Sequence, residues 1–114
     1  MLVHGRTREV VASRVELAVT WRARRTGLLG RAGLDAAAAM VLAPCLAVHT
    51  AFMRFPIDVL FVDRQGRAVR LVHGLRPWRV AAAPRAWAAI ELAAGALRRH
   101  GVEAGDRLEL VALD

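Results

Sequence analysis

The chain has 114 residues, one cysteine and a formal net charge of +7, and 56% of its residues are hydrophobic. This length fits a single domain, residues 1–114, and is too short for a two-domain nucleotide-binding enzyme or an eightfold α/β barrel. One cysteine excludes an intrachain disulfide framework, and the hydrophobic content excludes a disordered chain.

The first predicted elements are a strand, indicated by alternating apolar and polar residues, and a short helix after it, indicated by an N-cap residue. Residues 11–19 alternate between apolar and polar side chains, and this period of two predicts a half-buried strand. Thr20 is a suitable N-cap for a short helix over residues 21–29, which Gly30 would end.

The rest of the chain predicts a mostly β (α+β) fold, a compact β-barrel or sandwich of six to eight short strands with two short helices. Residues 57–63 are apolar on both faces and rich in Val, Ile and Phe, which is typical of a central strand. Further extended segments are predicted at residues 39–43, 46–53, 67–72, 87–92 and 107–111, with a loop over 73–84 and the second helix over 95–100.

No membrane segment is predicted. The N-terminal residues lack the apolar core of a secretory signal, so we expect a cytoplasmic protein. Residues 36–53 carry no charge and reach the length at which membrane helices begin. They are rich in Ala, however, and include Pro44, His49 and Thr50, so we interpret them as buried strands.

A motif in the middle of the chain is similar to a family signature. Residues 49–63 read HTAFMRFPIDVLFVD and are followed by Gly66. Together with three further pieces in order, they resemble the domain-of-unknown-function 192 family (uncharacterised protein family 0127) over about residues 15–111. The three pieces are residues 25–31, residues 90–92 with Gly95, and Gly101 with residues 105–106.

The resemblance implies a small, mostly β domain with one or two helices and no established activity. Many members of this family carry an export signal or a membrane anchor, which we do not expect here. Many also have a Trp-Met-x-Asn-Thr stretch before Pro-x-Asp, where this chain reads His-Thr-Ala-Phe-Met over residues 49–53. Anything bound by the common stretch is therefore expected to bind differently here, or not at all.

Two carboxylates that interrupt apolar strands indicate a candidate site. Asp58 and Glu91 would each be costly to bury unless paired or hydrogen-bonded. Either each bonds an arginine or loop amides and stabilises the fold, or both face one cleft with His49 as an acid/base group, or they line a polar pocket that binds a small ligand. We expect a ligand-binding end of the barrel formed by His49, Thr50, Arg54, Asp58, Trp78 and Glu91.

No motif of a nucleotide, flavin or zinc enzyme is present. We therefore predict a binding or accessory protein rather than an enzyme, without a cofactor, whose partner is an unknown small ligand or protein.

A metal site is the first alternative. Cys45, His49 and Met53 offer thiolate, imidazole and thioether, which copper prefers. On an extended strand the first two would lie about 13 Å apart, too far to share one ion. Only a helix or a tight loop would bring them together, and the alternative interpretation is that they pack in the core.

An anion-binding surface is the second alternative. All 17 basic residues are arginine, and the segment around Arg22, Arg24, Arg25 and Arg31 could hold phosphate or acidic headgroups. The chain has no Lys, Asn or Tyr, whereas Ala is abundant, which indicates a G/C-rich coding sequence. The arginine count by itself is thus weak evidence, and we do not expect nucleic acid as a partner.

Overall fold

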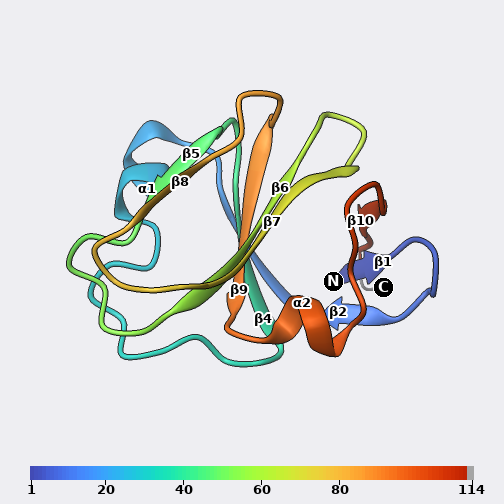
Figure 1. Ribbon diagram of the computed structural model, residues 1–114, viewed down its shortest axis with the longest axis horizontal. Coiled ribbons are helices and arrows are strands. Elements are labelled where there is room, and N and C mark those ends of the chain that lie inside the picture. Colours follow the sequence, from blue (N-terminus) through green and yellow to red (C-terminus); the bar gives the residue numbers. More distant parts are fainter. Residues whose placement is uncertain (113–114) are drawn as a thin grey trace.

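The computed structural model, which describes residues 1–112, confirms the mostly β fold class. This part of the chain contains ten strands and two short helices, arranged in three sheets of three, five and two strands (Figure 1). The strands outnumber the six to eight predicted because several span only three residues. They form three sheets rather than one closed barrel.

The five-stranded sheet is the centre of the fold and has the strand order β3-β4-β9-β6-β7. Strands β3 and β4 are parallel, and all other neighbours in this sheet are antiparallel. Strand β6 is buried along its whole length, as its apolar sequence predicted. The strands are β3 (Arg14–Ala18), β4 (Ala38–Leu42), β6 (Ile57–Val62), β7 (Ala68–Leu75) and β9 (Ala88–Ala93).

Two smaller sheets and the helices cover the central sheet. The three-stranded sheet has the order β10-β1-β2, and the two-stranded sheet pairs β5 with β8. Their bounds are β1 (Leu2–His4), β2 (Val10–Ala12), β5 (Ala47–His49), β8 (Val80–Ala82) and β10 (Leu108–Leu110), with helices α1 (Trp21–Thr26) and α2 (Ala96–Arg99).

The two faces of the central sheet carry separate hydrophobic cores. Leu60 and Ile90 are cross-strand partners on one face, which packs against β1, β2, β10 and α2. Val59 and Phe61 point to the other face, which packs against β5, β8 and the segment after α1. A side chain in β6 or β9 therefore reaches one or the other core according to whether its position is odd or even.

Helix α1 is shorter than the helix predicted over residues 21–29. It begins after Thr20, whose Oγ1 accepts a hydrogen bond from a backbone N–H of the first turn at 3.0 Å, as expected of an N-cap. It ends at Thr26 because Gly27 has φ 48° and ψ −124°, outside the helical region. The chain then turns and buries Leu28 in the core.

Three strand predictions need correction. The strand predicted over residues 11–19 is two strands that separate at Ser13. Strand β2 pairs with β1 in the three-stranded sheet, whereas β3 pairs with β4 in the central sheet. The extended stretch over 46–53 contains only β5, and a turn follows from Thr50. The loop predicted over 73–84 contains the end of β7 and all of β8. Each of these elements depends on a partner strand elsewhere in the chain, which local periodicity does not reveal.

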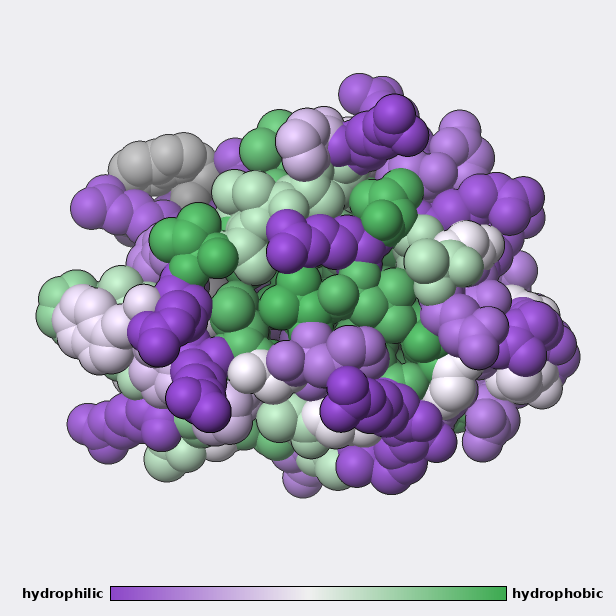
Figure 2. All heavy atoms as spheres, in the orientation of Figure 1, coloured by the Kyte–Doolittle hydropathy of each residue, from purple (hydrophilic) through white to green (hydrophobic). Residues whose placement is uncertain are grey.

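The surface is largely hydrophilic on the face seen in Figure 2, where a hollowed band of hydrophobic side chains crosses the centre. The helices within residues 1–112 have six and four residues, and neither could span a bilayer.

Asp106 connects the N-terminal strands to the last turn of the chain. Its carboxylate lies 2.6 Å from Nε2 of the buried His4 and 3.3 Å from Nε of Arg6, and it accepts the backbone N–H of Glu103 at 2.9 Å. The hydrogen bond from Arg6 is the largest reason why the pKa of Asp106 falls to about 2. This cluster joins the end of β1 and the loop after it to the turn that precedes β10.

We expect Asp106→Asn to lower the free energy of unfolding by about 2 kcal/mol near neutral pH, because His4 and Arg6 lose a charged acceptor. A carboxyl pKa that is depressed on folding stabilises the folded state above the unfolded pKa, so the wild type loses this contribution as the pH falls from about 4 to about 2. Urea unfolding at several pH values measures both effects. Asp35→Asn, at an exposed ion pair with Arg14, is the control, and an equal loss in the two variants would contradict the role of Asp106.

Candidate functional site

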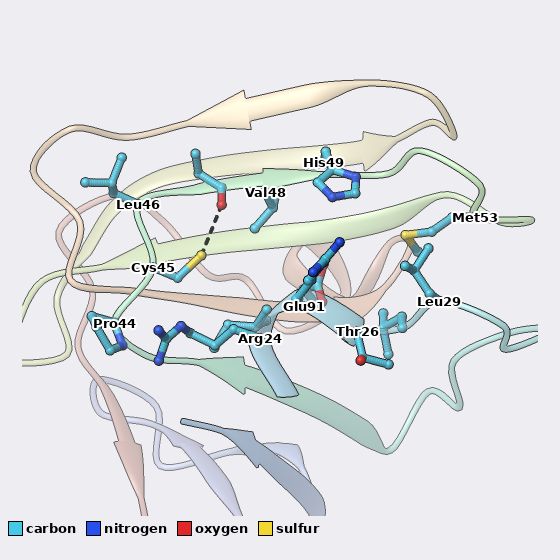
Figure 3. Close-up of a pocket in the computed structure, with 15 residues that line it drawn as sticks. Arg24, Thr26, Leu29, Pro44, Cys45, Leu46, Val48, His49, Met53 and Glu91 are labelled. Carbon is cyan, nitrogen blue, oxygen red and sulfur yellow. Dashed lines mark hydrogen bonds between the residues drawn. The ribbon is translucent and has the colours of Figure 1, made fainter. Parts of the chain in front are cut away.

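A cavity of about 420 Å³ opens between α1, the turn that follows it, and β5 (Figure 3). We call it the Glu91 cavity. Its wall is mostly apolar, and polar groups are contributed by Arg24, Arg25, Thr26, Cys45 and His49. The apolar lining residues are Leu28, Leu29, Leu42, Pro44, Leu46, Ala47, Val48 and Met53.

Glu91 lies in the middle of these residues (Figure 3). It belongs to β9, where its cross-strand partners are Met40 and Val59, so its side chain points to the face covered by β5 and α1. The residue is 4% exposed. Among residues 1–112 no hydrogen bond or ion pair to its carboxyl is found, and the carboxyl is turned toward the cavity.

Burial dominates the ionisation of this carboxyl. It raises the pKa of Glu91 to about 7, and the positive charge of Arg31 offsets only part of that rise. Near neutral pH Glu91 is therefore present partly as the neutral carboxylic acid, which can donate a hydrogen bond, and partly as the carboxylate, which can bind a cation.

The turn after α1 brings the backbone close to this carboxyl. Gly27 has a positive φ of 48°, and a Cβ there would lie 3.7 Å from Oε1 of Glu91, an ordinary contact distance. The demand for glycine therefore comes from the backbone conformation, which turns the chain over the cavity, rather than from lack of space.

Cys45 is not activated as a nucleophile. Its thiol donates a hydrogen bond to the carbonyl of Ala47 at 3.1 Å, drawn in Figure 3. Burial raises the pKa of Cys45, and the charge of Glu91 raises it further, although the backbone of Ala47 and the charge of Arg24 act in the opposite direction. Thiolate chemistry needs a lowered pKa, so this cysteine is suited to packing.

Cys45, His49 and Met53 all line the Glu91 cavity. The chain between Cys45 and His49 is not helical, and β5 is extended as the sequence predicted. A turn at Thr50–Met53 follows this short strand. Within residues 1–112, no three His, Cys, Asp or Glu side chains lie close enough together to hold a metal ion. The copper site stays a prediction, which titration with Cu⁺ and elemental analysis would test.

Asp58 does not share a site with Glu91. Its side chain points to the opposite face of the central sheet and is 0% exposed. The carboxylate accepts three backbone hydrogen bonds, from Gly74 at 2.8 Å, Leu97 at 3.0 Å and Gly95 at 3.1 Å. It thereby joins β6 to the end of β7 and to the start of α2 through backbone amides 16, 37 and 39 residues away in the sequence, which is the structural role considered above, filled by amides rather than by an arginine.

The six residues predicted to form one site lie in three places. His49 and Glu91 line the Glu91 cavity, Asp58 lies under α2, and Thr50 holds together the two loops that carry Arg54 and Trp78. The structure therefore brings His49 together with Glu91, and Thr50 together with Arg54 and Trp78, but it does not bring all six into one site.

Comparison with protein families places the fold in a known group. A model of the DUF192 family, described as "uncharacterized ACR", matches residues 3–110. The chain belongs to the DUF192 family. None of the curated proteins compared with the chain matches its sequence.

Two solved structures share the DUF192 fold seen here. One is a protein of unknown function from Novosphingobium aromaticivorans DSM 12444, with a TM-score of 0.77 and 24% identity, covering 84% of this chain and 74% of that one. The other is a candidate transcription regulator from Sinorhizobium meliloti 1021, with a TM-score of 0.77 and 27% identity, covering 83% of this chain and 79% of that one.

The sequence analysis missed that the segment after α1 forms one wall of the cavity. Two pieces of the DUF192 pattern carried the signal: residues 25–31, with Gly27, and residues 90–92, with Glu91, face each other across this space. Helix periodicity alone could not find it, because the lining leucines follow the helix end rather than belonging to its face.

Proposed function

We propose that this DUF192 domain binds a small amphipathic molecule in the Glu91 cavity without transforming it. The observation that carries the proposal is the carboxyl of Glu91, a residue only 4% exposed, which lines a mostly apolar cavity and has no hydrogen bond or ion pair among residues 1–112. An unpaired buried carboxyl lowers stability, so a use outside the chain accounts for it better than a structural role does.

The chemistry of the lining defines the ligand. Glu91 favours a protonated amine or another strong hydrogen-bond donor, and the leucines, Val48 and Met53 favour a hydrocarbon body. Arg24 is fixed at the rim because its Nη1 donates to the carbonyl of Val19 at 2.7 Å, and His49 lies on the opposite wall. These groups favour an anion at the other end, so the ligand class is a zwitterion with an apolar middle.

Binding is favoured over catalysis because the cavity lacks an activated nucleophile. The Cys45 thiol has a raised pKa, and its hydrogen bond to Ala47 holds it against the backbone. Glu91 is the one carboxyl among the described lining residues, so the second carboxyl that glycoside-hydrolysing pairs use is not provided, and His49 lies on the opposite wall.

The experiment uses 6-aminohexanoate as the probe, with hexanoate and hexylamine as matched single-charge probes, in isothermal titration calorimetry. We expect 6-aminohexanoate to bind with a dissociation constant on the order of millimolar, as suits a fragment of this size. Its affinity should rise as the pH increases through about 7, because the ammonium group binds the ionised form of Glu91 and a proton is released.

Glu91→Gln should weaken 6-aminohexanoate at least about tenfold, whereas Glu109→Gln, at a surface ion pair, should leave it unchanged. Hexylamine should keep part of the affinity and hexanoate should lose it. Equal binding of hexanoate and hexylamine, or full affinity in Glu91→Gln, would reject the proposal.

A further inference from the structure

Two loops lie side by side at one end of the molecule, on the left in Figure 1. They are residues 50–56, between β5 and β6, and residues 76–79, between β7 and β8. Thr50, which is 0% exposed, joins them: its Oγ1 donates to the carbonyl of Arg76 and accepts the N–H of Arg79 at 2.9 Å. Its backbone adds two bonds, from its N–H to the Arg79 carbonyl at 2.9 Å and from the Trp78 N–H to its carbonyl at 3.0 Å.

Two aromatic side chains project from these joined loops, and we call them the aromatic tip. Phe52 is 72% exposed and Trp78 is 60% exposed, and their ring centroids lie 4.5 Å apart with the planes tilted by 58°. Val80, beside them, is 74% exposed. At the same end, Figure 2 shows hydrophobic and intermediate side chains at the outer edge next to strongly hydrophilic ones.

The backbone at both aromatic residues is in the left-handed region. Phe52 has φ 65° and Trp78 has φ 64°, conformations that favour Gly or Asn and are uncommon for bulky residues. Since their rings are also mostly outside the core, neither backbone preference nor core packing accounts for these two residues. A contact outside the molecule does account for them.

Positive charge surrounds the aromatic tip. Arg54, Arg76 and Arg79 are exposed, and neither loop contains an acidic residue. Within residues 1–112 no ion pair to these three arginines is found, and the guanidinium of Arg79 donates only to the adjacent carbonyl of Trp78. Their charge is therefore left to complement an anionic partner.

We propose that the aromatic tip docks on the surface of an anionic lipid bilayer. Phe52 and Trp78 would enter the headgroup region, where amphipathic aromatic rings are favoured, and the arginines would contact lipid phosphates. This is peripheral binding, and it needs no spanning segment.

A bilayer fits this geometry better than a single-stranded nucleic acid does. Nucleic-acid readers present flat ring faces along a basic groove, on which successive bases stack. Here the two rings pack against each other into one projecting group, and neither lines the Glu91 cavity. The proposal is also independent of the ligand proposed for that cavity, because the two sites have no side chain in common.

The test is flotation with vesicles of phosphatidylcholine containing about one-third phosphatidylglycerol, compared with phosphatidylcholine alone. We expect binding to the anionic vesicles to be at least about tenfold stronger and to weaken as salt is added. Phe52→Asn with Trp78→Asn should reduce it at least about tenfold, since Asn keeps the left-handed backbone but removes the rings.

Arg76→Gln with Arg79→Gln should reduce binding about 25-fold, at about fivefold per arginine near the surface. Two controls remove the same kinds of group elsewhere on the surface. Arg98→Gln with Arg99→Gln removes the same charge from α2, and Trp87→Ala removes a partly exposed ring; each should change binding less than about threefold. Urea unfolding confirms that the variants are folded.

Any of three results would overturn the proposal. The first is equal binding to neutral and anionic vesicles, and the second is binding to anionic vesicles that the Phe52 and Trp78 changes leave intact. The third is tighter binding of an oligothymidylate through the same residues, which would assign the aromatic tip to nucleic acid.

Discussion

Asp58→Asn is expected to lower the free energy of unfolding by about 3–4 kcal/mol, the largest loss among the variants considered. The carboxylate is 0% exposed and accepts three backbone N–H groups, two at Oδ2 and one at Oδ1. An amide keeps one acceptor oxygen and turns an NH₂ group toward a remaining donor, so at least one buried N–H loses its partner. Urea unfolding measures the loss as a lower midpoint with an unchanged slope.

Asp63→Asn provides the matched control for Asp58→Asn. Asp63 also accepts two backbone N–H groups, from Gln65 and Arg67 at 2.9 Å each, but in a solvent-facing turn between β6 and β7. Water can replace its bonds, so we expect a loss of about 1 kcal/mol or less. Equal losses in the two variants would show that Asp58 does not hold β6, β7 and α2 together.

Glu91→Gln is expected to be more stable than the wild type at about pH 8, by on the order of 3 kcal/mol, and equally stable at about pH 4.5. The pKa of Glu91 is raised from 4.5 to about 7 by burial, so the folded state binds more protons than the unfolded state between these values. The wild type therefore loses stability as the pH rises through this window and levels off above about 7, whereas glutamine does not titrate.

The measurement is the difference in unfolding free energy between the variant and the wild type at several pH values. Taking the difference cancels the contributions of all other titrating groups. Glu109→Gln, at an exposed ion pair with Arg8, should show a difference below about 1 kcal/mol that does not follow this window. A flat difference for Glu91→Gln would show that the carboxyl is not buried and unpaired as described. A gain in stability with a loss of ligand affinity is the pattern expected of a residue kept for binding.

Much of the fold could be predicted because it depends on residues that are close in the sequence. The apolar run over 57–63 and the cap at Thr20 each produced an element near its predicted place, whereas the alternation over residues 11–19 indicated extended chain that the structure divides between two sheets. The motif over residues 49–63 indicated the DUF192 family, which the family model confirms. Strands β1, β5 and β8 have three residues each and depend on remote partners, so local patterns found them poorly or not at all.

The candidate site could be predicted only in part. Thr50 and Trp78 were both predicted as ligand-binding residues, and that role stays a prediction; their place at the aromatic tip depends on hydrogen bonds that join two loops far apart in the sequence. Arg24 and the turn at Gly27 were not connected to Glu91, because that contact exists only once α1 lies over β9.

The amino-acid pattern by itself determined that two carboxylates would be buried, since Asp58 and Glu91 both interrupt apolar strands. Their local contexts are alike, and nothing in them distinguishes a structural carboxylate from a functional one. The pairing of β6 with β9 decides the matter by placing Asp58 opposite Leu92 and Glu91 opposite Val59, on different faces of the sheet. One face offers the free N–H groups of a helix start and a strand end, and the other offers a cavity, so one carboxylate is satisfied within the chain and the other faces the cavity without a hydrogen bond or ion pair among residues 1–112.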